Sequence, residues 1–550
     1  MATTTRASQP ETPAPKGTPA PQASPRQPTW TSRLPRRAPF AARPAPRSAP
    51  PHAPSLRRHW PRLRSWLVRA RDRYPELPPM PTGTSARVGR LVVVAMALAF
   101  TCFFSAYLFR MHDALLTHAE DLGIMDQALW NTTHGALLHQ TICNSVSDRN
   151  CLGDISRFAI HFEPIMLPLA LLYRLASTPK TLQFLQAAIV ACGAFPAYWL
   201  AARRLRSVFA GVAFAALYLL YPALQAAVTF DFHAVTLSAA FLMFALYFLL
   251  ARDDRGLLIA CVLALATKEE VVLEVALIGL SAGVFQRRWR TAGGLLALSA
   301  IWLLLEVFIM HQASPLGYSP TATRYAALGH SPLEVAAYLL THPLTVLQRY
   351  VFEPRHLYYL RTLLAPTLYL ALASPLALLI AVPVLAINLL SGDPAMYSGV
   401  YQYSAELVPI VLFAAIESVA LLAGLGGWLA AHAAPRVEGW LWRRPRLGAR
   451  GRAWLGSPAP ARVVMLGLVA ATLLAGLRAQ RLHGYTPITQ GFSWPALATH
   501  ARLGGDLAQL IPPAASVSAQ SDLVPHLSQR RHVYLFPYQQ DTADYIFLDV

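Results

Sequence analysis

Seven acidic and histidine side chains stand out in short polar blocks of an otherwise apolar chain. They are Glu120, Asp121, Asp126, His161, Glu163, Asp231 and His233. Such side chains can hold a divalent cation, Mg²⁺ or Mn²⁺, that bridges to a phosphate, and a carboxylate can act as general base on an acceptor hydroxyl. Plainer alternatives exist, because Asp121 can be a helix N-cap and His161 with Glu163 can simply face water. The residue types alone leave both alternatives open.

Cations and aromatic rings in other polar blocks suggest how a phosphate and a sugar would be held. Lys268, in the block TKEE, can neutralise the phosphate of a lipid-linked ligand, and Arg324 is a second candidate for that role. Tyr401 and Tyr403 can stack on a sugar ring or on a lipid. The alternatives are an ion pair that closes a tight turn at Lys268 and an ordinary interfacial belt of aromatic residues.

Other motifs narrow the chemistry. The chain has no Walker loop, no Gly-rich dinucleotide fingerprint, no HExxH and no zinc spacing, so ATP-driven chemistry by this chain alone is not expected. Cys143 and Cys151 lie eight residues apart in one polar loop. They form a disulfide if that loop is extracytoplasmic, and the alternative is two free thiols.

The elements that must position these residues are membrane helices. Of the 550 residues, 55% are hydrophobic and only 14% are charged, whereas a soluble domain has about 25% charged residues. Residues 1–90 carry 17 basic against three acidic side chains, which is most of the net charge of +19. We interpret 1–55 as a disordered, Pro-rich cytoplasmic tail near anionic lipid and 56–90 as a basic interfacial segment. No fold that reads nucleic acid accompanies the tail, so no nucleic-acid partner is predicted.

Apolar runs fill residues 91–478, and we predict about eleven transmembrane helices there, an all-α polytopic fold. Basic clusters lie at 203–206, 251–255, 286–290 and 442–452. The positive-inside rule puts them in the cytoplasm with the N-terminus, provided that the stretch 164–176 does not cross fully. The outer loops 110–163 and 311–360, and every candidate residue above, then lie on the opposite side of the membrane.

The C-terminal residues 479–550 have a different residue pattern from the apolar runs before them. The segments ASVSAQ, HVYLFP and DYIFLDV are typical of short β-strands, and SDLVPHLS between them is typical of a turn or helix. We therefore predict a small α/β segment. The number of predicted membrane crossings before it places this segment on the extracytoplasmic side.

Several blocks carry a resemblance to a known family. They are EDLGIMDQALWNTTHG, HFEPIMLPLALLYRL, LYLLYPALQAAVTFDFHAVTLSAAFLMFALY, TKEEVVLEVALIGL and YQYSAELVPIVLFAAI. In this order and spacing they resemble the predicted membrane-protein family called domain of unknown function 2079, over roughly residues 90–550. The layout of that family is similar to the GT-C superfamily of membrane glycosyltransferases, which take a sugar from a polyprenyl-phosphate carrier at the outer face.

The resemblance implies roles for the candidate residues. Asp121 would be the general base or a metal-linked acid, and Lys268 would meet the donor phosphate. The cavity would be lined by Asp126, His161, Glu163, Asp231 and His233. The first outer loop reads Glu–Asp–Leu–Gly and lacks a DxD motif, which leaves a metal requirement open.

The function predicted from these observations is a GT-C-like glycosyltransferase of the bacterial cytoplasmic membrane. It would move a sugar from a polyprenyl-phosphate donor to a glycan, lipid or protein acceptor, with membrane lipid around it. A transporter or lipid flippase is the alternative, and it requires Glu274, Glu306 and Glu417 to face one internal channel. A third reading, a non-enzymatic scaffold, predicts no cavity behind Asp121.

Overall fold

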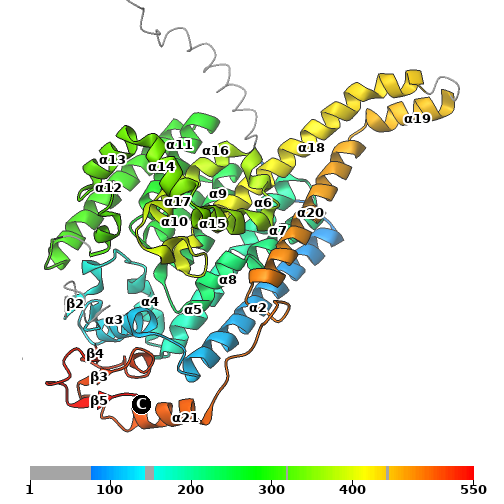
Figure 1. Cartoon of the computed structure of the whole chain (residues 1–550). Helices are drawn as coiled ribbons and strands as arrows, with labels where there is room; N and C mark the ends of the chain where they lie inside the picture. The colour runs from blue at the N-terminus through cyan, green and yellow to red at the C-terminus, as the bar shows by residue number, and fades with distance from the viewer. Residues whose placement is uncertain (1–75, 143–153, 318–319, 441–444, 550) are drawn as a thin grey trace, which may run out of the picture. The chain divides into compact units, whose positions relative to one another are not determined.

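The computed structural model describes residues 76–142, 154–317, 320–440 and 445–549. They form a mostly helical domain followed by a small α/β segment (Figure 1). The predicted tail 1–55 and the cysteines Cys143 and Cys151 lie outside the described residues.

Six helices of the described ranges are long and apolar enough to cross a membrane. They are α2 (Thr84–Asp113), α5 with α6 (Pro179–Arg204), η4 with α9 (Ala234–Ala251), α12 (Trp289–Ala313), the helix Gln402–Arg436 that contains most of α18 (Leu407–Trp440), and α20 (Ala459–His483). The pair α7 (Val208–Leu219) and α8 (Pro222–Thr229) makes a seventh if it is one span bent by 42°. Pro222 explains the bend, because its nitrogen cannot donate to the preceding turn. Six or seven of the roughly eleven predicted crossings thus meet this criterion.

Two regions predicted as pairs of spans contain shorter helices. The turn at Lys268 lies between α10 (Asp254–Leu265) and α11 (Val271–Gln286), as predicted. These helices have 12 and 16 residues, so they extend only about 18 and 24 Å, short of the roughly 30 Å apolar core of a bilayer. The interval 363–390 breaks into short turns, among them α16 (Pro375–Leu378) and α17 (Val382–Leu390).

The remaining polar-loop helices are also short. They are η2 (Ala119–Gly123), α3 (Ile124–Thr133), η3 (Arg157–Ala159), α4 (Met166–Tyr173), η5 (Pro320–Tyr325), α13 (Pro332–Thr341), α14 (Pro343–Val346), η6 (Leu347–Val351), α15 (Pro354–Leu364), η10 (Pro394–Tyr397), η11 (Gln402–Ser404) and α19 (Pro445–Leu455). Helix α4 has eight residues and is too short to cross a membrane. The placement of all basic clusters on one side of the membrane required that the stretch 164–176 does not cross fully.

Sharp turns at basic residues return the chain into the helical domain. Arg252 adopts a left-handed conformation with φ of 57° and ends α9, and Asp253 then caps α10 by accepting from the Gly256 N–H at 3.0 Å. Arg288, which lies between α11 and α12, forms an ion pair with Asp254 at the start of α10. Arg203 donates to the backbone oxygens of Leu77 and Pro78, in the segment before α2. We call the end of the domain at which these arginines lie the basic end.

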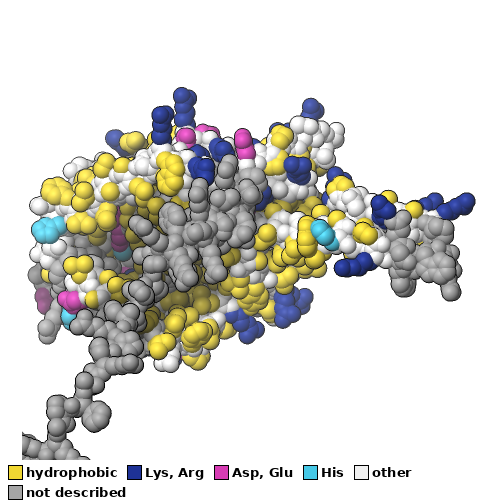
Figure 2. Space-filling view, turned by 90° about the horizontal axis from the view of Figure 1, so that it is seen from above, with side chains coloured by type: hydrophobic (Ala, Val, Ile, Leu, Met, Phe, Trp, Pro, Cys, Tyr) yellow, Lys and Arg dark blue, Asp and Glu magenta, His cyan; other side chains and the backbone are white. Residues whose placement is uncertain are grey.

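Burial separates inner from outer helices. Helices α9 and α18 are largely enclosed by their neighbours, whereas α12 exposes Ile301 (65%) and Leu304 (72%) and α20 exposes Leu474 (66%). Figure 2 shows hydrophobic side chains across much of one face. Apolar helix faces of this kind are stable against lipid tails, as expected of a multi-pass membrane protein.

The C-terminal segment is a small α/β unit, as predicted. Helix α21 (Thr499–Gln509) precedes three parallel strands in the order β4–β3–β5. They are β3 (Val517–Ala519), β4 (Val533–Leu535) and β5 (Tyr545–Phe547), with η12 (Val524–His526) between β3 and β4. Val517 pairs in register with Val533 and with Tyr545. A second, antiparallel pair joins β1 (His139–Gln140) to β2 (Ile155–Ser156).

Candidate functional site

The C-terminal segment packs directly on the first polar loop. Gln127 donates to the backbone oxygens of Arg530 and Arg531 at 3.3 and 3.2 Å and accepts from the Thr141 N–H at 2.8 Å. The Thr141 hydroxyl in turn donates to the Val533 carbonyl oxygen at 2.6 Å. These groups are buried, so the contact holds η2 and α3 in one position relative to the sheet.

Two of the predicted site acids serve this contact. Asp126 is completely buried and accepts from the hydroxyls of Tyr173 (2.5 Å) and Ser528 (2.6 Å). Glu120 accepts from the Ser521 hydroxyl at 2.8 Å. Asp126 therefore does not line a cavity as the resemblance implied, because α3 is enclosed between α4 and the C-terminal segment.

Replacing Asp126 with asparagine is expected to remove a pH-dependent loss of stability. Burial raises the pKa of Asp126 to about 6, although hydrogen bonds from Ser528, Tyr173 and Gln529 act to lower it. Because the folded pKa exceeds the unfolded value, this carboxyl stabilises the fold below about pH 4, and the contribution is lost as the pH rises through about 6. The shift corresponds to about 3 kcal/mol.

Apparent melting temperatures of the purified protein in detergent measure this effect. Relative to wild type, Asp126→Asn should become more stable as the pH is raised from about 4 to about 7.5. Asp113→Asn is the matched control, since Asp113 is exposed and only pairs with Lys180. A difference between Asp126→Asn and wild type that is constant over this pH range would contradict the prediction.

Two histidine–carboxylate pairs form beside this contact from segments more than a hundred residues apart. The Asp121 carboxylate lies 2.8 Å from Nε2 of His233, and the Asp231 carboxylate lies 3.0 Å from Nδ1 of His118. Asp231 also accepts from the backbone N–H of His118 at 3.0 Å. The Asp231 side chain is 2% exposed and that of Asp121 is 22% exposed, so Asp121 is the carboxylate of the two that a bound molecule can reach.

Asp121 makes no helix cap. Neither η2 nor α3 has a side-chain cap, and the carboxylate is turned toward His233 instead. Because Nδ1 of His233 lies 3.1 Å from the Phe230 carbonyl oxygen, which can only accept, Nδ1 carries a proton. Nε2 of His233 then faces the Asp121 carboxylate and fixes its orientation. A carboxylate held this way can accept a proton from a bound hydroxyl.

The charges of the site keep Asp121 ionised. Burial alone would raise the pKa of Asp121, but the charge and hydrogen bond of His233, with His118 and Arg157, lower it below its usual value. The hydrogen bond to Asp231 raises the pKa of His118. The pKa of Asp231 is raised, in contrast to that of Asp121, because burial raises it more than His118 lowers it. Asp121 therefore stays ionised to a lower pH than an ordinary aspartate does.

Gln186, a polar residue in the apolar helix α5, holds the loop that carries Asp231 and His233. Its amide nitrogen donates to the backbone oxygens of Val228 (2.9 Å) and Asp231 (2.7 Å), and its oxygen accepts from the His233 N–H (2.9 Å). The loop needs this support because Asp231 has a φ of 46°, a conformation unfavourable for most L-residues. A polar residue inside an apolar run was the signal in the sequence that could have identified Gln186.

Replacing Gln186 with leucine is expected to destabilise the protein by roughly 2–5 kcal/mol, since three buried backbone groups lose their partners. Gln183→Leu on the same helix is the matched control. Gln183 is fully buried, and its side-chain oxygen and nitrogen have no hydrogen-bond partner among the described residues. That control should be neutral or stabilising in a thermal melt. Equal melting temperatures for the two variants would contradict the assigned role of Gln186.

A cavity of about 320 Å³ is lined by three glutamates, Glu269, Glu270 and Glu306, as well as by cations. The residues of the two histidine–carboxylate pairs are not among its lining residues. Lys268 and Arg324 both line it, and both lie over the ring of Tyr403, at 5.6 and 5.8 Å from its centre. Lys268 also forms an ion pair with Glu270 at 2.6 Å, and Arg324 lies 3.4 Å from Asp393. Lys268 thus forms the ion pair that was its alternative role, and it also lines the cavity.

His161 and Glu163 do not act as one metal-binding pair. His161 lines the cavity and lies 2.7 Å from the Glu269 carboxylate. Glu163 is buried and accepts from Arg157 at 2.9 Å. The charge of Arg157 helps to lower the pKa of Asp121. The Arg157 carbonyl oxygen accepts from the N–H of His161, which lines the cavity, at 3.1 Å.

Two tyrosines pack against side chains of these segments. Tyr401 packs edge-on against Phe230, next to the Asp231 loop, with the ring centres 4.5 Å apart. Tyr403 lies under Lys268 and Arg324. We call this region, where residues 118–126, 157–163, 230–233, 266–270 and 391–404 meet, the polar end of the domain. Across the described ranges, no three His, Cys, Asp or Glu side chains are arranged to hold a metal ion.

Comparison with known proteins places the chain in a family. The family model described as "Predicted membrane protein (DUF2079)" matches residues 111–436 and 462–550. A comparison with curated proteins gave no match.

Two solved structures illustrate the structural matches. ArnT from Cupriavidus metallidurans bound to undecaprenyl phosphate matches with a TM-score of 0.41 and 14% identity, over 82% of this chain and 86% of that chain. The Archaeoglobus fulgidus oligosaccharyltransferase in the apo form matches with a TM-score of 0.36 and 12% identity, over 82% of this chain and 65% of that chain. At these scores neither match carries an argument about this chain. The family match, in contrast, covers more than half of it, and the chain belongs to the family of predicted membrane proteins DUF2079.

Proposed function

We propose that this protein is a membrane glycosyltransferase that takes a sugar from a polyprenyl-phosphate donor. One observation carries the proposal: the carboxylate of Asp121, held by His233, and a cavity that Lys268 and Arg324 line both belong to the polar end. A carboxylate that can act as base and cationic side chains that can meet a phosphate are what transfer of a sugar from a phosphate to a hydroxyl requires. The GT-C-like layout of the sequence supports the same assignment.

The proposed reaction uses the chain's own side chains. Asp121 accepts the proton of the acceptor hydroxyl as that oxygen attacks the anomeric carbon of the sugar. The bond between the anomeric carbon and the phosphate oxygen breaks, and the electron pair leaves with the polyprenyl phosphate. Burial alone would lower the pKa of Lys268, but Glu270, Glu269 and Glu406 raise it, so its charge persists to stabilise the departing phosphate.

The transport alternative gains no support from its three glutamates. Glu306 lines the cavity at the polar end, and Glu417 lines a separate groove with Arg204. Glu274 is fully buried, and neither carboxylate oxygen has a hydrogen-bond partner among the described residues. The three side chains therefore do not line one cavity.

The test is turnover of a panel of polyprenyl-phosphate sugars by the purified full-length protein. We expect release of polyprenyl phosphate from at least one donor when glycan, lipid and protein acceptors are supplied together. Parallel reactions with Mg²⁺, with Mn²⁺ and with a chelator measure whether the divalent cation suggested by the sequence is required. Folded protein that binds lipid yet releases polyprenyl phosphate from no donor would overturn the proposal.

A further inference from the structure

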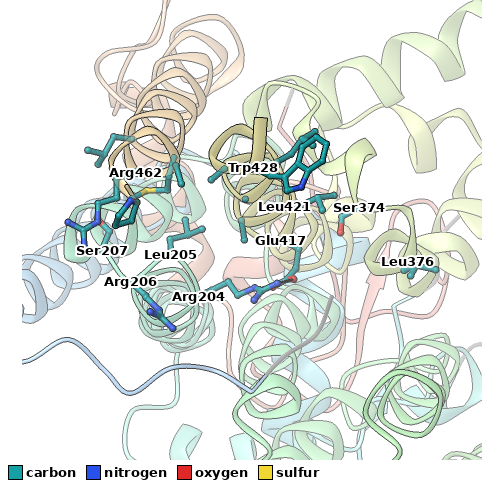
Figure 3. A pocket seen from close by; sticks show the side chains of 18 of the residues that line it. Arg204, Leu205, Arg206, Ser207, Ser374, Leu376, Glu417, Leu421, Trp428 and Arg462 are labelled. Carbon is teal, nitrogen blue, oxygen red and sulfur yellow. Dashed lines mark hydrogen bonds and ion pairs between the residues drawn. The ribbon is translucent and has the colours of Figure 1, made fainter. Parts of the chain in front are cut away.

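A second and larger cavity lies at the basic end, away from the site described above. It is a groove of about 1,020 Å³ between α18, α20 and the loop 205–207. Figure 3 shows Arg206, Ser207 and Arg462 along one side and Ser374 and Leu376 on the other, with the Arg204–Glu417 pair between them. The volume is at the upper limit for small-molecule sites, so the groove holds more than a headgroup.

The charge of the groove is positive. Arg204 makes two hydrogen bonds of 2.8 Å to Glu417, and these two buried groups neutralise each other. Arg206 and Arg462 remain, and among the described residues neither guanidinium has an ion-pair partner. Glu417 is the one carboxylate among the described residues that line the groove. An anion therefore fits this wall, and a cation does not.

Helix N-termini add to this positive charge. Ser207 caps α7 by accepting from the Ala210 N–H at 3.2 Å, and α20 begins at Ala459, directly after Pro458, which lines the groove. Both helices thus begin at the groove. The first N–H groups of a helix carry a partial positive charge that favours phosphate.

The other surface of the groove is apolar and open. Leu421, Leu425, Trp428 and Leu466 line it and are 40%, 49%, 55% and 42% exposed. Together with the arginine wall, this makes a surface that is cationic on one side and apolar on the other. A molecule with a phosphate and hydrocarbon chains is complementary to both.

We propose that the groove binds an anionic glycerophospholipid, with its phosphate at Arg206 and Arg462 and its acyl chains along Leu421, Trp428 and Leu466. The location selects this occupant over the polyprenyl phosphate of the proposed reaction. The groove is at the basic end, and basic loops face the leaflet whose surface is rich in anionic lipids. The proposed donor site is at the opposite, polar end. The lipid site therefore stands whether or not the protein is a transferase.

The experiment titrates delipidated full-length protein in detergent with phosphatidylglycerol and, separately, with phosphatidylcholine, and counts bound lipid by native mass spectrometry. Phosphatidylglycerol should bind wild type saturably. The double variant Arg206→Gln/Arg462→Gln should bind it about tenfold more weakly or worse, since two charge-assisted contacts are lost. The matched control is Arg255→Gln/Arg290→Gln, which removes the same charge from exposed positions of the same end but outside the groove. It should bind like wild type.

A second readout is independent of charge removal. Phosphatidylglycerol with brominated acyl chains should quench the fluorescence of Trp428, and Trp428→Phe should lose that quenched component while still binding lipid. Equal phosphatidylglycerol binding by the groove variant and the control would overturn the proposal. So would equal binding of phosphatidylcholine by wild type, or saturable binding in the groove of polyprenyl phosphate alone.

Discussion

Asp121→Asn is expected to lower kcat for sugar transfer by a factor of about 10² to 10⁴, the usual contribution of a general base. Asparagine brings an amide group that can donate to Nε2 of His233 or accept from it, so the pair retains its contact and the protein its fold. What is lost is the ability to take a proton from the acceptor. The KM for the donor should change little, because the donor phosphate is assigned to other groups.

The measurement compares release of polyprenyl phosphate by Asp121→Asn, wild type and Asp113→Asn under the same conditions. Asp113 is a matched control, since it is an aspartate at the end of α2 whose partly exposed carboxylate pairs only with Lys180. Such surface pairs contribute little to stability. If Asp121→Asn turned over the donor as fast as Asp113→Asn, Asp121 would not be the base.

The second large effect is expected for Lys268→Met. The side chain of Lys268 is 8% exposed and pairs with Glu270, with Glu269 and Glu406 also within range of its charge. Removing the cation leaves acidic groups buried without compensation, a change that typically costs about 3–5 kcal/mol. A large fall in melting temperature is therefore expected, together with loss of donor turnover.

A double variant separates the two effects. Lys268→Met/Glu270→Gln removes both charges of the ion pair, so most of the lost stability should return. Donor turnover should not return, because the positive charge at the cavity is still missing. Recovery of activity together with stability would show that Lys268 acts on the fold alone. Arg361→Gln, which alters an exposed arginine outside the cavity, is the control for a general loss of positive charge.

The amino-acid sequence by itself determined the class of the fold and the separation of its two ends. Apolar runs can be recognised without tertiary information, because a helix in lipid must satisfy its own backbone and bury apolar side chains along its whole length. Basic clusters such as 203–206 and 286–290 indicate the shared end because charge is excluded from the membrane interior. The strands β3, β4 and β5 were predicted for a similar reason, as β-branched and aromatic runs between turn residues.

The partners of each charged side chain were decided only by tertiary structure. Asp121 and His233 are 112 positions apart, and Asp126 meets Ser528 across 402 positions. No local pattern encodes such contacts, since they depend on how the helices pack and not on spacing along the chain. The sequence predicted one cavity for Asp121 and Asp126, with Asp121 as the base and Asp126 in the lining. The structure leaves Asp121 22% exposed and buries Asp126 completely, because the C-terminal segment contributes Ser528 to the carboxylate of Asp126.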